Sequence, residues 1–329
     1  MKAIEFIQYG PPHEVCRCIE VNAPPPPKGD QVTIAVEAAA INPADLLILE
    51  GRYPGPQPPA RQGIEGAGKV VAIGEDVTEF NIGDQAMLLG RNNWVEKQTI
   101  PASQAIKIPN EMDILQAAQI KANPPSAMLM LTNYEDLKEG DWVIQNAANS
   151  AVGLHIIKLA QARGIRTVNV VRRKDLFNIL QEHGADVVVL EGSDLGSRVR
   201  DKVGDARMPL AIDAIGGASC MHLADCLSNG GTVVNYGFLS GDPCMLTPTH
   251  TIVRQIKLVG FWLGPSLFNS SHDVIKTTYA EIAQMFIDGL LHSTVEATYT
   301  LDQVKTALEH AGREGRSGKI IFTPNGPIS

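Results

Sequence analysis

Six short apolar runs follow one another between residues 141 and 263 of the chain. Their sequences are DWVIQNA, RTVNVV, ADVVVL, MPLAIDAI, GTVVNYG and IKLVGFWL, and helical patterns lie between them near 152–163, 174–183 and 217–228. Strands that alternate with helices in this way form a parallel sheet with helices on both faces, joined by right-handed crossovers. The pattern therefore predicts an α/β fold with a doubly wound parallel sheet.

The first 120 residues follow a different pattern. Short extended segments such as QVTIAVEAAAI, GAGKVVAIG and WVEKQTI are broken by proline and glycine, which predicts a small, mostly antiparallel β domain. A helical pattern near 272–290 and the closing strand GKIIFT have no place in the alternating series, so we expect them to return to the first domain. The expected domains are 1–121 together with 265–329, and 122–264.

Charge and composition argue against several classes of protein. The net charge is −8 and the basic residues are scattered, so we expect no nucleic acid as a partner. No apolar run approaches the roughly 18 residues that cross a bilayer, so we expect no membrane segment. The N-terminus MKAIEFIQYG enters a strand pattern at once, and the five cysteines form no metal-binding set. These features predict a cytoplasmic protein in a reducing compartment.

The stretch QNAANSAVGLHIIKLAQARG, residues 145–164, has the arrangement of a phosphate-binding turn. A GxGxxG fingerprint laid on it falls at Ala148, Ser150 and Gly153, so only the third position is glycine. A strand still leads through small residues into a helix, whose first N–H groups can hold a pyrophosphate. A plain strand-to-helix turn explains the stretch equally well. The candidate cofactor contacts are Asn149, Ser150, Ala151, Val152 and Gly153.

The end of the next strand distinguishes between the two nicotinamide cofactors. An NAD site carries an acidic residue about 20 positions after the turn, which binds the ribose 2′-hydroxyl. Here TVNVV is followed by Arg172, Arg173 and Lys174, and the first acid is Asp175. Guanidinium groups bind a 2′-phosphate, so the sequence predicts NADPH. The alternative is a solvated basic cap on the strand. Three more candidates follow the strand GTVVN, at the edge where nucleotides lie: Tyr236, Gly237 and Phe238.

With a β domain first and a dinucleotide domain second, the chain resembles the medium-chain dehydrogenase/reductase superfamily over essentially its full length. The segment GIEGAGKVVAIGEDVTEFNIGD, residues 63–84, carries that resemblance. It implies a GroES-like β domain and a Rossmann domain. In the zinc alcohol dehydrogenases of the superfamily a histidine precedes the glutamate, whereas this chain has Ile64, and Asn42 or a close neighbour replaces the expected cysteine. Isoleucine cannot bind zinc, so we expect no metal and a zinc-free oxidoreductase acting on an activated alkene or a quinone.

Four segments are similar to the enoyl-thioester reductases related to mitochondrial trans-2-enoyl-CoA reductase: QNAANSAVG, TVNVVRRKD, NYGFLSG and GFWL. The segment NPADLLILEGRYPG is similar to both that branch and the quinone oxidoreductases. The resemblance implies NADPH-dependent reduction of the double bond of a trans-2-enoyl thioester, a step of fatty acid metabolism. The alternative is reduction of a quinone or another small activated alkene. Ala151, where the family usually has glycine, and Arg52, where a smaller polar residue is common, depart from the family pattern.

The resemblance also assigns candidate roles for the chemistry. Tyr53, in the proline-rich loop 51–63, is the expected proton donor or enolate-positioning group, although an aromatic plug in that loop is the simpler explanation from sequence alone. Asn42 is a candidate oxyanion-hole amide or a turn-starting residue before proline. Trp262 is expected at the active-site cleft, or in the core.

Phe261 is a further candidate near the cofactor, and one strand is a candidate interface. The resemblance also places Ser126 and Lys319 near the cofactor more weakly, since a helix-starting serine and a surface lysine explain them nearly as well. The apolar strand IKLVGFWL needs cover at the sheet edge, which predicts a homodimer formed by pairing of that strand across a two-fold axis. A third possibility is a structural or RNA-binding protein that keeps the fold and merely holds NADPH, and the acidic net charge argues against its RNA-binding form.

Overall fold

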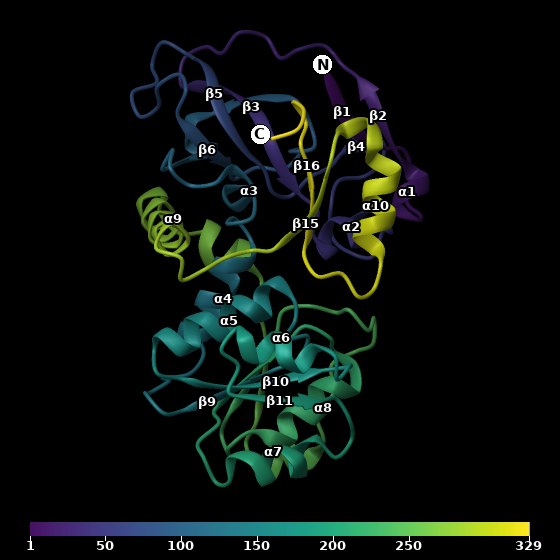
Figure 1. The fold of residues 1–329 in the computed structure, drawn as a ribbon, viewed down its shortest axis with the longest axis vertical. Coiled ribbons are helices and arrows are strands. Elements are labelled where there is room, and N and C mark those ends of the chain that lie inside the picture. The colour runs from purple at the N-terminus through teal and green to yellow at the C-terminus, as the bar shows by residue number, and fades with distance from the viewer. Residues whose placement is uncertain (329) are drawn as a thin grey trace. The chain divides into compact units, whose positions relative to one another are not determined.

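The computed structural model describes residues 1–328. Its contacts divide the chain into two compact units (Figure 1). Unit 1 comprises Met1–Ala122 and His272–Ser329, and unit 2 comprises Asn123–Ser271. The sequence-based limit of 264/265 differs from this division because a short π-helical turn, η3 (Gly264–Phe268), follows the last strand of unit 2 before the chain returns at His272.

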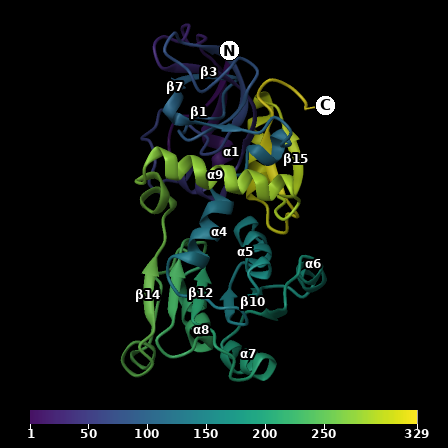
Figure 2. The same cartoon turned by 90° about the vertical axis from the view of Figure 1, so that its left-hand side faces the viewer.

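Unit 2 is built on a six-stranded sheet with the order β11-β10-β9-β12-β13-β14. Every neighbouring pair in it is parallel, which confirms the predicted doubly wound sheet. Figure 2 shows β14 at one edge of this sheet. The order reverses direction between β9 and β12, and ligands of such sheets bind outside the carboxyl ends of the strands at that point. The strands are β9 (Trp142–Gln145), β10 (Arg166–Val171), β11 (Val187–Leu190), β12 (Leu210–Asp213), β13 (Thr232–Asn235) and β14 (Lys257–Gly260).

Helices cover both faces of this sheet and form two separate apolar clusters. Ile157 and Leu180 pack with Val171 and Val188 in one cluster, and the other cluster joins Leu195 and Leu223 to strand residues such as Val168. Ile157 belongs to α5 (Ala151–Ala162) and Leu180 to α6 (Leu176–Glu182). Leu195 belongs to α7 (Leu195–Val203) and Leu223 to α8 (Gly217–Cys226). The unit also contains α4 (Asn123–Thr132) and the π-helical turn η2 (Thr249–Val253).

The helix α7 is among those absent from the sequence-based expectation. Its nine residues, LGSRVRDKV, bury only Leu195 and Val199. These two residues are four positions apart and therefore lie on one face of the helix. The helix is amphipathic, but most of its residues are polar or charged, so no apolar run marks it in the sequence.

Unit 1 is mostly antiparallel, as the sequence predicts. A three-stranded sheet has the order β2-β1-β4, and a larger sheet has the order β15-β16-β3-β5-β6-β8, with β7 also paired to β3. The C-terminal strand joins the larger sheet because Ile321 and Phe322 pair antiparallel with Ala40 and Ala39. The strands are β1 (Lys2–Phe6), β2 (Cys16–Glu20), β3 (Gln31–Ala40), β4 (Ala60–Arg61), β5 (Ala67–Ile73), β6 (Gln85–Leu88), β7 (Lys97–Pro101), β8 (Ala105–Ile108), β15 (Val295–Tyr299) and β16 (Lys319–Phe322).

Short helices and one apolar cluster complete unit 1. Trp94 and Phe322 are buried in this cluster and meet edge to face, with ring centroids 5.2 Å apart. The helical segments are α1 (Pro12–Val15), α2 (Pro43–Leu49), η1 (Ala102–Gln104), α3 (Ile114–Ala117), α9 (His272–Ile287), η4 (Leu301–Gln303) and α10 (Val304–Gly312). Among residues 1–328, no helix is long and apolar enough to span a bilayer.

Candidate active site

The turn between β9 and α5 lies at the carboxyl edge of the unit 2 sheet. Ser150 caps α5, and its hydroxyl oxygen accepts a hydrogen bond from the Gly153 N–H at 3.1 Å. A Cβ on Gly153 would lie 2.5 Å from the Ala148 carbonyl oxygen, so the third fingerprint glycine permits close packing of the helix on the turn. Ala147 has a φ of 47°, the left-handed conformation that glycine usually supplies. The turn therefore keeps its shape with one essential glycine and a mildly strained alanine.

A network of buried side-chain amides supports this turn. Gln145 donates through Nε2 to the Gly153 carbonyl oxygen at 2.9 Å and to Asn169 Oδ1 at 2.8 Å. Asn146 donates through Nδ2 to Asp213 Oδ1 at 2.6 Å and accepts the Ala214 N–H at 2.7 Å. These bonds connect the ends of β9, β10 and β12 at the point where the strand order reverses.

Asp213 is the centre of that network, and sequence reasoning missed it. Its carboxylate accepts N–H bonds from Ile215 and Gly216 and from the Asn235 side chain. Among the described residues, the group with metal-ligand chemistry is Asp213 with Cys220 and Cys244. Because the carboxylate already accepts several N–H bonds, its evident role is to hold the loops after β12 and β13. The signal in the sequence was a polar residue near the end of each of three apolar runs, namely Asn146, Asp213 and Asn235.

Arg172 and Arg173 follow β10 directly, at the same edge of the sheet, and both are exposed. The Arg173 guanidinium lies 3.7 Å from an Asp175 carboxylate oxygen, and its side chain is 48% exposed. An exposed pair at this distance contributes little to stability, so Arg173 can exchange this partner for a ligand phosphate. Binding of a 2′-phosphate by the two arginines stays a prediction.

The other candidates of unit 2 follow the ends of β13 and β14. Burial raises the pKa of the Tyr236 hydroxyl to about 12, and the Ser150 side chain opposes that shift. A Cβ on Gly237 would lie 2.6 Å from the Ala214 carbonyl oxygen. Phe261 is buried at the end of β14, whereas Trp262 is 54% exposed. Ser126 is buried within α4. Asn149 lies in the turn after β9, Ala151 and Val152 are the first two residues of α5, and Phe238 lies in the loop after β13.

In unit 1 the short helix α2 carries one candidate at its start and another just beyond its end. Asn42 is the N-cap of α2 and forms a capping box with Asp45. The Tyr53 N–H bonds to the Leu47 carbonyl oxygen at 3.2 Å, so the chain after the helix folds back onto it. The Tyr53 side chain is half-buried, and neighbouring Arg52 pairs with Glu50 at 3.0 Å. One rigid element therefore fixes the backbone of both candidates.

The Asn42 side chain lies in a buried charged cluster. Its Nδ2 donates to Glu65 Oε2 at 2.6 Å, and its Oδ1 accepts a hydrogen bond from the Lys319 ammonium. Glu65 also accepts the Ala122 N–H at 2.8 Å. Burial lowers the pKa of Lys319, while the Glu65 charge opposes that shift. The sequence resemblance gave Lys319 a cofactor contact; its observed partner is Asn42, and the cofactor contact stays a prediction.

Two further buried groups complete the cluster. Asp45 accepts N–H bonds from Asn42 at 2.8 Å and from Ile64 at 3.0 Å. The Lys121 ammonium donates to the carbonyl oxygens of Ile64 and Gly90, each at 2.6 Å. The cluster therefore contains two carboxyl groups and two amines, those of Asp45, Glu65, Lys121 and Lys319. Buried charges need such compensation by groups of opposite charge. Ile64 contributes only backbone atoms to these bonds.

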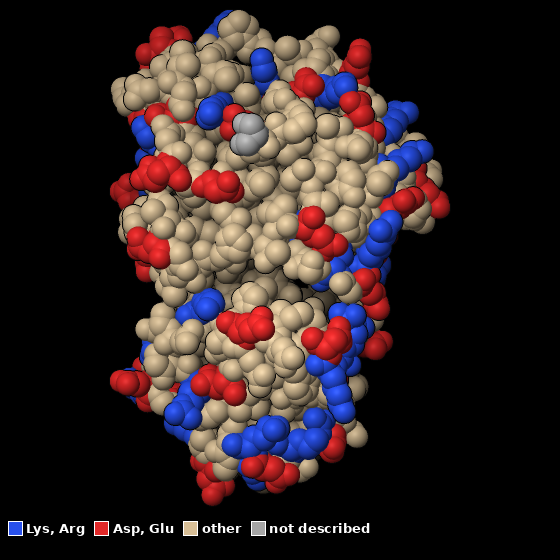
Figure 3. All heavy atoms as spheres, in the orientation of Figure 1, with Lys and Arg blue, Asp and Glu red and all other residues tan. Residues whose placement is uncertain are grey.

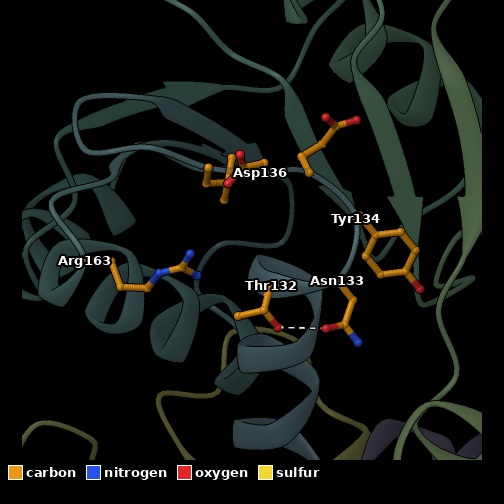
Figure 4. Close-up of a pocket in the computed structure, with 7 residues that line it drawn as sticks. Thr132, Asn133, Tyr134, Asp136 and Arg163 are labelled. Carbon is orange, nitrogen blue, oxygen red and sulfur yellow. Dashed lines mark hydrogen bonds between the residues drawn. The ribbon is translucent and has the colours of Figure 1, made fainter.

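A hollow on the surface of unit 2 is a separate feature (Figure 4). It is lined by Thr132, Asn133, Tyr134, Asp136 and Arg163, with the Thr132 hydroxyl donating to Asn133 Oδ1 at 3.0 Å. These residues precede β9 or follow α5, so the hollow lies at the amino ends of the strands. Dinucleotides bind at the opposite edge of such sheets, and we therefore exclude this hollow from the candidate active site.

Comparisons with known proteins agree with this architecture. Residues 151–280 match the family model described as zinc-binding dehydrogenase, and residues 28–110 match the alcohol dehydrogenase GroES-like domain. The chain is 38% identical over 263 residues to a mitochondrial enoyl-[acyl-carrier-protein] reductase of Caenorhabditis elegans, a match that covers 78% of this chain and 75% of the relative.

Two solved structures superpose on almost the whole chain. A structure from Bacillus thuringiensis that is assigned as an NADPH:quinone reductase has a TM-score of 0.90 and 27% identity, and covers 98% of both chains. The mitochondrial 2-enoyl thioester reductase Etr1p/Etr2p heterodimer from Candida tropicalis has a TM-score of 0.85 and 25% identity, and covers 98% of this chain and 99% of that one.

The chain belongs to the medium-chain dehydrogenase/reductase family of oxidoreductases. Within that family it falls with the mitochondrial-type enoyl reductases and the quinone oxidoreductases.

Proposed function

We propose that the chain reduces the carbon–carbon double bond of a trans-2-enoyl thioester with NADPH. The observation that carries this proposal is the attachment of Asn42 and Tyr53 to one short helix, α2, in a chain 38% identical to an enoyl reductase. An amide and a phenol are the two kinds of group that enolate chemistry needs, one to stabilise the oxygen and one to supply a proton.

The residues of unit 2 fit a dinucleotide phosphate. The helix α5 is 12 residues long and presents its N-terminus at the carboxyl edge of the sheet, where N–H groups favour an anion. Gly153 and Gly237 allow the backbone to pack closely around the turn, because a Cβ at either position would clash with a carbonyl oxygen. Arg172 and Arg173 at the end of β10 favour the 2′-phosphorylated cofactor. When bound, NADPH supplies the hydride that reaches the β carbon of the substrate.

The residues of unit 1 then act on the enolate that this reduction produces. The Asn42 amide donates a hydrogen bond to the thioester oxygen as negative charge develops there. The Tyr53 hydroxyl either gives a proton to the α carbon or holds the enolate in position for protonation. A positioned general acid contributes roughly 10²–10⁴-fold to a rate.

Tyr53→Phe tests this proposal. It is expected to lower kcat with crotonyl-CoA at least tenfold while NADPH affinity changes little, because the phenyl ring keeps the packing and loses only the hydroxyl. Tyr9→Phe is the matched control, since Tyr9 is another partly exposed tyrosine of unit 1. Turnover of Tyr53→Phe close to that of the wild type would remove the catalytic role from Tyr53.

The second candidate function is NADPH-dependent reduction of a quinone or another small activated alkene. The similarity to the Bacillus thuringiensis structure favours it. Stopped-flow oxidation of NADPH with crotonyl-CoA and with a simple quinone separates the two candidates. A rate seen with the quinone alone would transfer the assignment to the second function.

We also propose that the partners are a small molecule and a second copy of this chain. On the face of unit 2 drawn in Figure 3, acidic and basic side chains are interspersed, which does not favour a nucleic-acid backbone. The edge strand β14 leaves Leu258 38% exposed, and the preceding turn exposes Ile252 and Val253 at 71% each. Pairing of β14 across a two-fold axis would cover this edge. The cytoplasmic location and the role in fatty acid metabolism stay predictions.

A further inference from the structure

Two charged groups hold the Asn42 side-chain amide from opposite sides. Its oxygen accepts from the Lys319 ammonium, and its nitrogen donates to Glu65 Oε2 at 2.6 Å. Asn42 is 5% exposed, Lys319 8% and Glu65 0%. Because an amide is planar and its two ends differ chemically, these contacts allow one orientation of the group and disfavour the flipped one.

Both charged groups are fixed by the scaffold of unit 1. Glu65 uses its second oxygen to accept the Ala122 N–H at 2.8 Å. Lys319 is the first residue of β16, and its N–H bonds to the Thr294 carbonyl oxygen at 2.8 Å. The backbone N–H of Asn42 is held by Asp45 at 2.8 Å. The amide therefore rests on a preorganised support rather than on mobile side chains.

The charges also change the chemistry of the amide. An ammonium at the amide oxygen draws electron density from the nitrogen, which makes its N–H groups stronger donors, and hydrogen bonds in such chains reinforce one another. The effect is largest in a buried site, where the effective dielectric is low. The Lys319 ammonium places its positive charge next to the Asn42 side-chain oxygen, and Glu65 fixes the orientation of the Asn42 side-chain nitrogen.

We propose that Lys319 and Glu65 are positioning residues that orient the Asn42 amide, and that Lys319 also polarises it, so that its N–H stabilises the negative oxygen formed during reduction. The inference rests on the proposed function, and it gives Lys319 a task different from the cofactor contact implied by the sequence resemblance. Glu65 accepts a hydrogen bond from the amide nitrogen, and the reacting oxygen becomes a further acceptor for this nitrogen during turnover.

A mutant cycle between Lys319 and Asn42 tests this inference. Lys319→Met is expected to lower kcat about tenfold or more, with the KM for crotonyl-CoA and the Kd for NADPH within about threefold of wild type. In an Asn42→Ala background, the same Lys319→Met change is expected to lower kcat by less than about threefold, because the group through which Lys319 acts is gone. Lys319→Arg, which keeps the charge, is expected to restore part of kcat.

The opposite results would overturn the inference. A Lys319→Met variant that binds NADPH tenfold more weakly and keeps its kcat would make Lys319 a cofactor contact. Equal losses of kcat in the presence and absence of Asn42 would show that the two residues act independently. Because Lys319→Met leaves buried carboxyl groups without compensation and can impair folding, selective ¹⁵N labelling of asparagine provides a second measurement. The Asn42 side-chain resonance is expected to shift in Lys319→Arg and Glu65→Gln, and an unchanged resonance in both would contradict the proposed contacts.

Running the cycle with crotonyl-CoA and with a quinone separates this inference from the proposed function. A wild-type chain that reduces the quinone alone refutes the enoyl-thioester proposal, while coupling between Lys319 and Asn42 in that reaction would still support the inference. A wild-type chain that reduces neither substrate overturns both. Normal wild-type turnover of crotonyl-CoA with uncoupled variants overturns the inference alone.

Discussion

Gly153 gives a direct test of the architecture of the phosphate turn. A Cβ at this position would lie 2.5 Å from the Ala148 carbonyl oxygen and 2.8 Å from both the carbonyl carbon and the Cα of Ala148. All three atoms are backbone, so they move only if the turn itself shifts. Overpacking of a filled site costs about 1–3 kcal/mol, and alanine regains about 1 kcal/mol over glycine in a helix. Because the contacts are short and rigid, we expect Gly153→Ala to destabilise unit 2 by about 1–2 kcal/mol.

Hydrogen exchange measured by mass spectrometry on peptides from β9 and α5 gives the free energy of opening in this region. The matched control is Gly312→Ala at the end of α10, where an added Cβ would meet no atom within 4 Å. The control is expected to be neutral or slightly stabilising. A Gly153→Ala protein whose β9 and α5 peptides exchange as slowly as in the wild type would refute the requirement for glycine at the third fingerprint position.

Two further predictions concern assembly and pH. Leu258→Lys, on the exposed edge strand β14, is expected to shift the protein toward monomer in size-exclusion chromatography with light scattering. The control Ile82→Lys, at a 68% exposed site in unit 1, should leave the measured mass unchanged. An equal effect of both substitutions would contradict pairing through β14. Burial lowers the pKa of Lys121 from 10.5 to about 8. Between about pH 8 and 10.5 the Lys121 amine is protonated in the unfolded chain but not in the folded one. The free energy of unfolding of the wild type, compared with that of Lys121→Met, should therefore rise with pH over this range by about 3 kcal/mol. Urea unfolding from pH 8 to 10.5 measures this difference, and a constant or falling difference would contradict the buried state of the amine.

Much of the fold could be predicted because its signals are local. The parallel series after residue 141 and the broken strands before it depend on short apolar runs with clear periods. The helix α7 was missed because its residues are mostly polar or charged, so that no apolar run marks it in the sequence. The left-handed φ of Ala147 was also beyond prediction, since alanine seldom adopts that conformation and the surrounding structure imposes it.

The contacts of the candidate site were harder to predict, since they join distant segments. Lys319 and Asn42 are 277 positions apart, and Asn146 and Asp213 are 67 apart. No local pattern relates such residues, and only the pairing of β16 with β3 and of β12 with β9 brings them together. The sequence could therefore name Lys319 as a candidate without revealing its partner.

Selection of the phosphorylated cofactor by Arg172 and Arg173 is tested most directly by calorimetric titration of the protein with NADPH and with NADH. Charge-assisted hydrogen bonds contribute about 1.5–3 kcal/mol, which corresponds to roughly 10–100-fold in affinity. We expect NADPH to bind at least tenfold more tightly than NADH, and the Arg172→Ala/Arg173→Ala double variant to lose that preference while keeping its affinity for NADH. Equal or tighter binding of NADH by the wild-type protein would contradict the claim.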